Sequence, residues 1–187
     1  MAATRTLSTA EERSDALVRA AVRVFAGAGF HATPTTAVAA EAGISTAYAF
    51  KLFPTKVDLF VAAVDACYDR IVDTLRGAVG PDVRGRAALD AMGSAYAALI
   101  ADRTLLMLQV HALAATSEPR IRDAVRRGVA RTVEVAQDLT GAPAQEIQDF
   151  LAVGQLCHLL TAIDAFALDD EWATTVTEGI EHLPTHP

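Results

Sequence analysis

The sequence is poor in cysteine and lysine and has no long apolar run. Its two cysteines, Cys67 and Cys157, stand outside any C-x-x-C pair, so zinc and thiol-redox sites have no support and both side chains are expected to be small buried apolar groups. The longest apolar stretch, residues 105–115, is too short to cross a bilayer. We therefore expect a cytoplasmic protein that has no membrane partner, no metal and no cofactor.

Glycine and proline are also scarce, with 11 and 7 residues in a chain of 187, whereas alanine is abundant. Alanine and arginine favour helices, and no segment shows the alternating pattern of a strand. The sequence predicts an all-α fold of about nine helices after a frayed tail over residues 1–8. The expected helices span about residues 10–27, 34–42, 46–52, 56 to an end within 77–81, 82–101, 103–115, 118–140, 143–167 and 169–182.

Helix ends are predicted from residues that cap helices or break them. Side-chain oxygens before a helix accept hydrogen bonds from its free amides, so four hydroxyl residues are expected N-caps, and a glycine can end a helix with a left-handed backbone. These residues are Thr9, Thr33, Ser45 and Thr55 as N-caps, and Gly29 as the end of the first helix.

Two short helices separated by Gly43-Ile44-Ser45 form a motif of their own. A helix, a three-residue turn that contains glycine and a second helix match the helix-turn-helix that places its second helix in the DNA major groove. The segment 46–52 is then the expected recognition helix.

The residues around this motif resemble the DNA-binding domain of the TetR (TetR/AcrR) family of bacterial transcriptional regulators. The resemblance covers about 50 residues and includes AGIS at 42–45 and FPTK at 53–56. It is carried by Arg13, Leu17, Ala20-Ala21, Phe25, Gly29-Phe30, Thr33, Thr36, Val38-Ala39, Ala42-Gly43-Ile44-Ser45, Phe50, Phe53-Pro54-Thr55-Lys56 and Leu59.

The resemblance implies two domains, a helix-turn-helix domain over residues 9–56 and a ligand-binding and dimerisation domain over residues 57–187. It also implies that residues just after the capping serine read base edges and that nearby residues contact phosphate. Tyr48 stands where the family has threonine, and Phe50 lacks the hydroxyl of the family's tyrosine, which Tyr48 can supply. The implied DNA-binding residues are Thr36, Ser45, Thr46, Ala47, Tyr48, Lys51 and Lys56.

The charge distribution agrees with this assignment once the chain is divided. A net charge of −7 argues against a nucleic-acid partner, since phosphate-binding domains are usually basic. However, residues 1–56 hold six basic and four acidic residues, which give a net charge of +2. Residues 57–187 hold ten basic and nineteen acidic residues, which give a net charge of −9. Both lysines lie in the first part, and no carboxylate occurs between residues 42 and 57.

The C-terminal region is predicted to form a homodimer and to bind an unknown small-molecule effector. The segment 143–167 is apolar nearly all round, which suits a subunit interface, and the resemblance extends that interface to 143–182. A two-fold dimer predicts a pseudo-palindromic double-stranded DNA operator. Polar residues on otherwise apolar helices are pocket candidates, or alternatively hydrogen-bonded core residues: Tyr96, Gln109, His111, His158 and Asp164.

Enzyme motifs such as G-x-S-x-G, a Walker loop, G-x-G-x-x-G and H-E-x-x-H do not occur in the sequence, so no catalytic residues are predicted. The expected function is a sequence-specific transcriptional regulator, a repressor released from DNA by a small, largely hydrophobic ligand. The alternative is a helical protein of the same fold that binds a small molecule or a partner and does not bind DNA.

Overall fold

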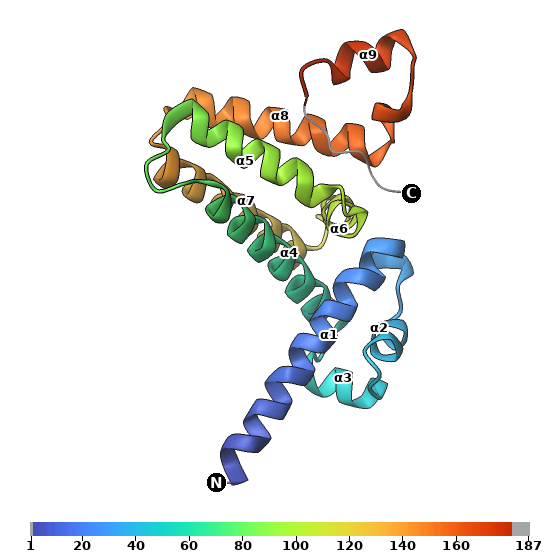
Figure 1. Cartoon of the computed structure of the whole chain (residues 1–187). Coiled ribbons are helices and arrows are strands. Elements are labelled where there is room, and N and C mark those ends of the chain that lie inside the picture. The colour runs from blue at the N-terminus through green and yellow to red at the C-terminus, as the bar shows by residue number, and fades with distance from the viewer. Residues whose placement is uncertain (1, 181–187) are drawn as a thin grey trace. The chain divides into compact units, whose positions relative to one another are not determined.

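A computed structural model describes the backbone of residues 2–180 and the side chains of residues 10–180 (Figure 1). This part of the chain is all-α and contains no strand. Its elements are α1 (Ala2–Ala32), α2 (Thr35–Glu41), α3 (Thr46–Leu52), α4 (Lys56–Ala78), α5 (Gly85–Ile100), α6 (Arg103–Ala114), α7 (Pro119–Thr140), α8 (Ala144–Ala162), the 3₁₀ turn η1 (Ala165–Ala167) and α9 (Glu171–Thr177).

The residues group into two compact units by their contacts. The first unit holds the chain up to Cys67 together with Met107–Arg126, and the second holds Tyr68–Leu106 together with the chain from Arg127 onward. Helices α4, α6 and α7 each contribute to both units. The domain limits 9–56 and 57–187 stay a prediction.

Aromatic side chains form the centre of the first unit. The rings of Phe25 and Phe60 meet edge to face with centroids 4.8 Å apart, and Phe30 lies 5.2 Å from Phe60. Burial of such rings is a main source of folding free energy. Three apolar residues that carry the resemblance are fully buried, namely Phe25, Val38 and Leu59. In contrast, Ile44 and Phe53, for which the apolar pattern also predicts core positions, are only half-buried.

Helix α4 buries one apolar face, as the spacing of its apolar residues in the sequence predicts. Its residues recur every three or four positions, so they share one face of the helix. All are at most 3% exposed: Phe60, Val64, Cys67, Ile71 and Leu75. Burial raises the pKa of the Cys67 thiol to about 12, so this cysteine stays a protonated, apolar side chain.

The first helix is longer than predicted. It begins at Ala2, so the expected N-cap at Thr9 and the frayed tail are wrong; residues 2–8 contain no glycine or proline, and the backbone continues through Thr9 as helix. At the other end Gly29 has a φ of 74° and a ψ of 179°, a break after which the helix continues to Ala32. The predicted positive φ of Gly29 is confirmed, but its ψ is not that of a left-handed helical residue.

The start of α2 also differs from the prediction. The N-cap is Pro34 and no side chain caps the helix, whereas Thr33 was expected to do so. Thr33 is 2% exposed, and its hydroxyl has no hydrogen-bond partner among the described residues. Packing has therefore turned this side chain into the protein interior and away from the free amides of α2.

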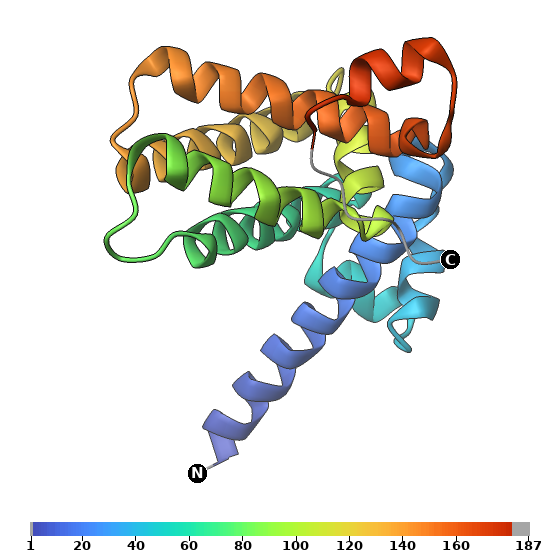
Figure 2. The same cartoon turned by 45° about the horizontal axis from the view of Figure 1, so that its top comes forward.

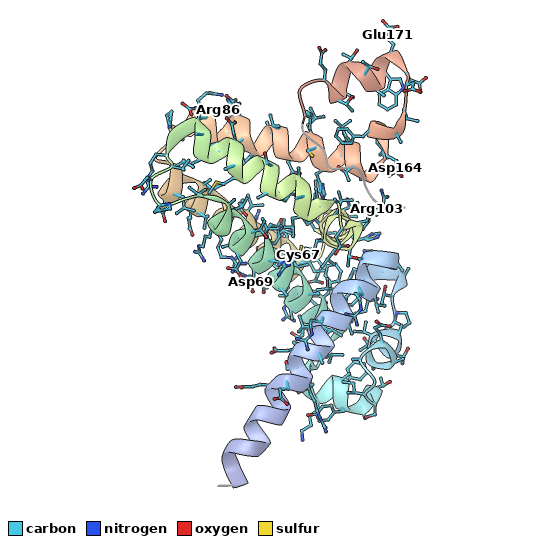
Figure 3. The ribbon with its side chains drawn as sticks, in the orientation of Figure 1. Cys67, Asp69, Arg86, Arg103, Asp164 and Glu171 are labelled. Atoms are coloured by element: carbon cyan, nitrogen blue, oxygen red, sulfur yellow. The ribbon has the colours of Figure 1, made fainter. Side chains whose placement is uncertain are left out.

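The C-terminal helices are shorter than expected. The predicted helix 143–167 ends at Ala162 because Asp164 takes a left-handed backbone, with a φ of 56° and a ψ of 32°. Arg103 donates to the carbonyl oxygens of Thr161 and Ala162 and to the Asp164 carboxylate, which stabilises this end (Figure 3). The predicted helix 169–182 is observed as α9 up to Thr177, and residues 181–182 lie outside the described residues.

No single helix in the described part of the chain is long and apolar enough to cross a membrane. One bent pair, α5 with α6, reaches that length and apolar character only when both helices are counted together.

Candidate nucleic-acid interface and ligand groove

The predicted helix-turn-helix is present, with α2 and α3 beside α1 in both views (Figures 1 and 2). Gly43 has a φ of 67°, and the amides of Gly43 and Ile44 donate to carbonyl oxygens in the last turn of α2. The Ser45 hydroxyl accepts a hydrogen bond of 3.2 Å from the amide of Tyr48. The turn and its serine cap are therefore confirmed.

Helix α3 presents most of its surface to solvent. Among its residues only Ala49 is buried, whereas Ala47, Phe50 and Lys51 are exposed and share one face at helical spacing. Thr36 on α2 and the capping Ser45 are also exposed, and Thr46 is half-buried. A short helix with one buried alanine and an open face has the form required to enter a groove of DNA.

Tyr48 is held against α1. The Arg13 guanidinium carbon lies 5.5 Å from the centroid of the Tyr48 ring, a cation–π contact that limits where the phenol can point. Arg13 belongs to the family pattern in the sequence, but this contact with Tyr48 was not predicted. It brings a positive charge next to the residue that replaces the family's threonine.

Lys56 is less free than a surface lysine. Its ammonium donates to the carbonyl oxygen of His31 over 3.2 Å and lies 4.8 Å from the centroid of the Phe30 ring. Partial burial lowers the pKa of Lys56. The lysine predicted to contact phosphate therefore also joins the start of α4 to the end of α1.

The carboxylates on each side of the acid-free segment 42–57 are both paired with arginines. Glu41 accepts from Arg23 at 2.9 and 2.8 Å. Asp58 accepts from Arg120, which follows 62 residues later. Sequence reasoning missed Arg120, because no local pattern connects positions so far apart in the chain.

The start of α4 is a reciprocal cap. The Asp58 carboxylate accepts from the amide and the hydroxyl of Thr55 at 2.8 and 2.6 Å, and the amide of Asp58 donates to the Thr55 hydroxyl at 3.1 Å. The Thr55 and Arg120 hydrogen bonds lower the pKa of Asp58. The predicted Thr55 cap is therefore confirmed, with Asp58 as its partner.

A groove in the second unit contains one of the five predicted pocket residues, Tyr96. It measures about 350 Å³ and lies between α5 and α8, which run side by side (Figure 2). Leu89, Phe150 and Val153 give it an apolar wall, and Glu146 is one of the carboxylates at its edge. Its volume falls in the range of small-molecule sites.

The other four predicted pocket residues do not line this groove. Gln109 is buried at 7% exposure, and the ring of His111 packs against Gly29 in the first unit. Asp164 is exposed and forms an ion pair of 2.6 Å with Arg103 (Figure 3). His158 is buried, and its Nε2 lies 3.1 Å from the carbonyl oxygen of Leu106.

A second groove, of about 380 Å³, lies between α4 and α7 and was not predicted from the sequence. Its walls are charged, with Asp69, Asp73, Glu134 and Asp138 around Arg131. Charged residues at the surface of two amphipathic helices look like ordinary solvated positions in the sequence, so no signal distinguished them.

His158 makes the stability of the fold depend on pH. Burial lowers its pKa, and the Leu106 carbonyl only partly opposes this. The unfolded chain therefore binds a proton more readily than the folded chain, so stability is complete above a pH of about 6.5 and falls as the pH decreases below it. Melting curves between about pH 8 and 5 are expected to show this fall, and His158→Gln, whose amide can still donate to Leu106, is expected to reduce it. His31→Gln at an exposed position is the control and should show the same fall in melting temperature as the wild type. If His158→Gln also showed a fall equal to that of the wild type, His158 would not be the source of the pH dependence.

Comparison with known proteins adds a sequence match and a fold match. Residues 17–63 match the model of a family described as bacterial regulatory proteins, tetR family. No curated protein matches the chain. A TetR-like transcriptional regulator from Rhodococcus sp. RHA1 is similar in structure, with a TM-score of 0.64 and 23% identity over 90% of this chain and 92% of that one.

Two further solved structures show the same likeness. A TetR-family transcriptional regulator from Rhodococcus sp., described as putative, has a TM-score of 0.69 and 20% identity, over 88% of this chain and 94% of that one. The transcriptional regulator FadR from Bacillus subtilis, solved in complex with stearoyl-CoA, has a TM-score of 0.69 and 15% identity, over 89% of this chain and 98% of that one. At these identities the likeness shows the fold.

Proposed function

The chain belongs to the TetR family of bacterial regulatory proteins, and from that premise we propose that it is a DNA-binding transcriptional regulator, specifically a repressor that a small, largely hydrophobic ligand releases from its operator. The observation that carries the DNA-binding part is the open, carboxylate-free face of α3. The carboxylates that flank it in the sequence, Glu41 and Asp58, are each paired with an arginine. Such a surface can approach phosphates without repulsion.

We assign base contacts to Thr46, Ala47 and Tyr48, the first residues of the recognition helix. Phosphate contacts fall to Thr36, Ser45, Lys51 and Lys56, which surround that helix. Phosphate contacts fix the position of the protein on the duplex, whereas base contacts give sequence preference.

A homodimer through residues 143–182 is part of the proposal. Apolar residues in α8 and at its C-terminal end are half-exposed among the described residues: Val153 at 54%, Leu159 at 54% and Ile163 at 50%. An exposed apolar strip of this kind is typical of a subunit interface. Two recognition helices related by a two-fold axis would read an operator with inverted half-sites.

Release by a ligand is proposed from the groove between α5 and α8, which has an apolar wall and a polar edge. FadR of Bacillus subtilis, a protein of the same fold, binds stearoyl-CoA in its solved structure, which supports a partly hydrophobic effector for this chain. The ligand would favour a dimer whose recognition helices do not match the operator spacing.

Selection of bound duplexes from random DNA tests the proposal directly. Inverted repeats are expected, and binding should weaken as salt increases, because counterions are released from the contacted phosphates. Recovery of no preferred sequence and no salt-sensitive binding would instead favour the helical binding protein without DNA activity.

Lys51→Ala is expected to weaken binding to all duplexes and to reduce the slope of log affinity against log salt by about one, because Lys51 is exposed and contacts only phosphate in this proposal. Its melting temperature should stay that of the wild type. Lys56→Ala is expected to reduce the slope and also to lower the melting temperature, because it removes the hydrogen bond to His31. An unchanged slope in both variants would contradict the phosphate roles.

A further inference from the structure

Asp58 occupies an unusual electrostatic position. It is the one carboxylate in the sequence between residues 42 and 64, and it lies two residues after Lys56 in the first turn of α4. Its carboxylate accepts the two hydrogen bonds of Thr55 that cap the helix. Its negative charge lies two residues from Lys56 in the first turn of α4, so it would weaken the attraction of Lys56 for a phosphate. At physiological salt such an effect reaches over about one Debye length, roughly 8 Å.

Arg120 compensates for this charge. Oδ2 of Asp58 faces Thr55, and Oδ1 accepts a hydrogen bond from Nη2 of Arg120. The side chain of Asp58 is 23% exposed and that of Arg120 is 54% exposed, so the guanidinium is the more exposed partner of the pair. Each carboxylate oxygen has a donor, and the donor to Oδ1 carries a full positive charge.

The position of Arg120 is set by packing. The neighbouring residues Ile121 and Ala124 of α7 are fully buried, and the amide of Arg120 donates to the Glu118 carboxylate at 3.3 Å. The guanidinium is thus presented from an ordered helix start and not from a flexible tail. The first unit includes both Asp58 and Arg120, although 62 residues separate them.

We propose that Arg120 sets the DNA affinity of this regulator by neutralising Asp58, so that the start of α4 can accept a phosphate beside Lys56. The inference rests on the proposed DNA-binding function and adds a residue from outside the helix-turn-helix to it. Arg120 acts through Asp58 and is not itself a contact to DNA. Its effect on affinity therefore depends on the charge at position 58.

The test is a double-mutant cycle on a duplex recovered by the selection, with affinity measured by fluorescence anisotropy at two salt concentrations. Arg120→Gln is expected to weaken binding by about two- to fivefold, the size of an exposed charge interaction. Asp58→Asn keeps a carbonyl oxygen for the Thr55 cap and removes the charge. In the Asp58→Asn background, Arg120→Gln is expected to change affinity by less than about 1.5-fold, because no carboxylate is left to neutralise.

Arg126→Gln is the matched control, because Arg126 is an exposed arginine of the same helix that pairs with Asp123 of its own helix. It is expected to bind as tightly as the wild type, and melting curves check that every variant is folded.

If Arg120→Gln reduced DNA affinity equally in the wild type and in Asp58→Asn, the result would overturn the inference in favour of a direct phosphate contact. If it reduced affinity in neither background, the inference would be wrong outright. A wild type that binds no duplex would overturn the proposed function and this inference together, whereas the other outcomes affect the inference alone.

Discussion

Gly128→Ala is expected to lower the free energy of unfolding by about 2–3 kcal/mol, the cost of forcing extra atoms into a packed interior. A Cβ at position 128 would lie 2.2 Å from Cγ and Cδ2 of Tyr68 and 2.5 Å from Cδ1. Rotation of the ring about its Cβ–Cγ bond leaves Cγ in place, so turning the ring alone cannot relieve the clash. Glycine is therefore required at this point of α7 by the close approach of the ring.

Gly128→Ala is expected to change stability in the direction opposite to that of most glycine-to-alanine changes in helices. Glycine in a helix interior normally costs about 1 kcal/mol relative to alanine, so the same change in open space would stabilise the protein. Gly93→Ala in α5 is the control, because a Cβ there would meet nothing within 4 Å. Melting temperature should fall by roughly 4–12 °C in Gly128→Ala and stay or rise in Gly93→Ala.

Tyr68→Ala provides the second half of this experiment. In that background Gly128→Ala should cost much less, because the ring that the new methyl group meets is gone. Equal costs in both backgrounds, or a rise in melting temperature for Gly128→Ala alone, would show that α7 does not approach Tyr68 this closely.

Gly29→Ala is expected to destabilise the first unit by about 2–4 kcal/mol, for two independent reasons. With a φ of 74° and a ψ of 179°, Gly29 lies in a region of backbone space that is nearly closed to residues with a Cβ. The added Cβ would also lie 2.6 Å from Nδ1 of His111. Both the break in α1 and the packing of α6 against it depend on glycine here.

The two costs can be separated by experiment. His111→Ala should relieve the steric part of Gly29→Ala and leave the backbone part, so denaturant unfolding is expected to show partial rescue. Gly27→Ala, two residues earlier in the same helix and with nothing within 4 Å, should be neutral or stabilising. A Gly29→Ala protein that unfolds at the same denaturant concentration as Gly27→Ala would contradict both the strain and the contact.

Local chemistry made the helix-turn-helix predictable. Ser45 and Thr55 cap their helices as expected because each directly precedes a helix whose first amides have no other partner. The same reasoning failed at Thr9, where helix formers on both sides continue the helix, and at Thr33, where burial of the side chain outweighed capping. A hydroxyl before a helical segment therefore indicates a cap only where tertiary packing leaves it free to turn.

Pairings between distant residues were not predictable. Arg120 and Asp58, or Arg103 and Asp164, carry no shared periodicity, so only the folded chain brings them together. Polarity on an apolar helix was also an unreliable sign of a pocket. Nε2 of the buried His158 lies within hydrogen-bond distance of the Leu106 carbonyl oxygen, and such a partner is what buried polar residues commonly have.

The arginine–aspartate pairs of α4 and α7 restrict the lengths of these helices. Asp58 pairs with Arg120 and Asp69 pairs with Arg131, and both pairs are separated by 62 residues in the chain. Each residue inserted into a helix rotates everything beyond it by about 100°. An insertion or deletion of one residue between the two arginines would therefore turn one of them away from its aspartate, so related sequences should vary here by substitution and keep the spacing of 11 residues.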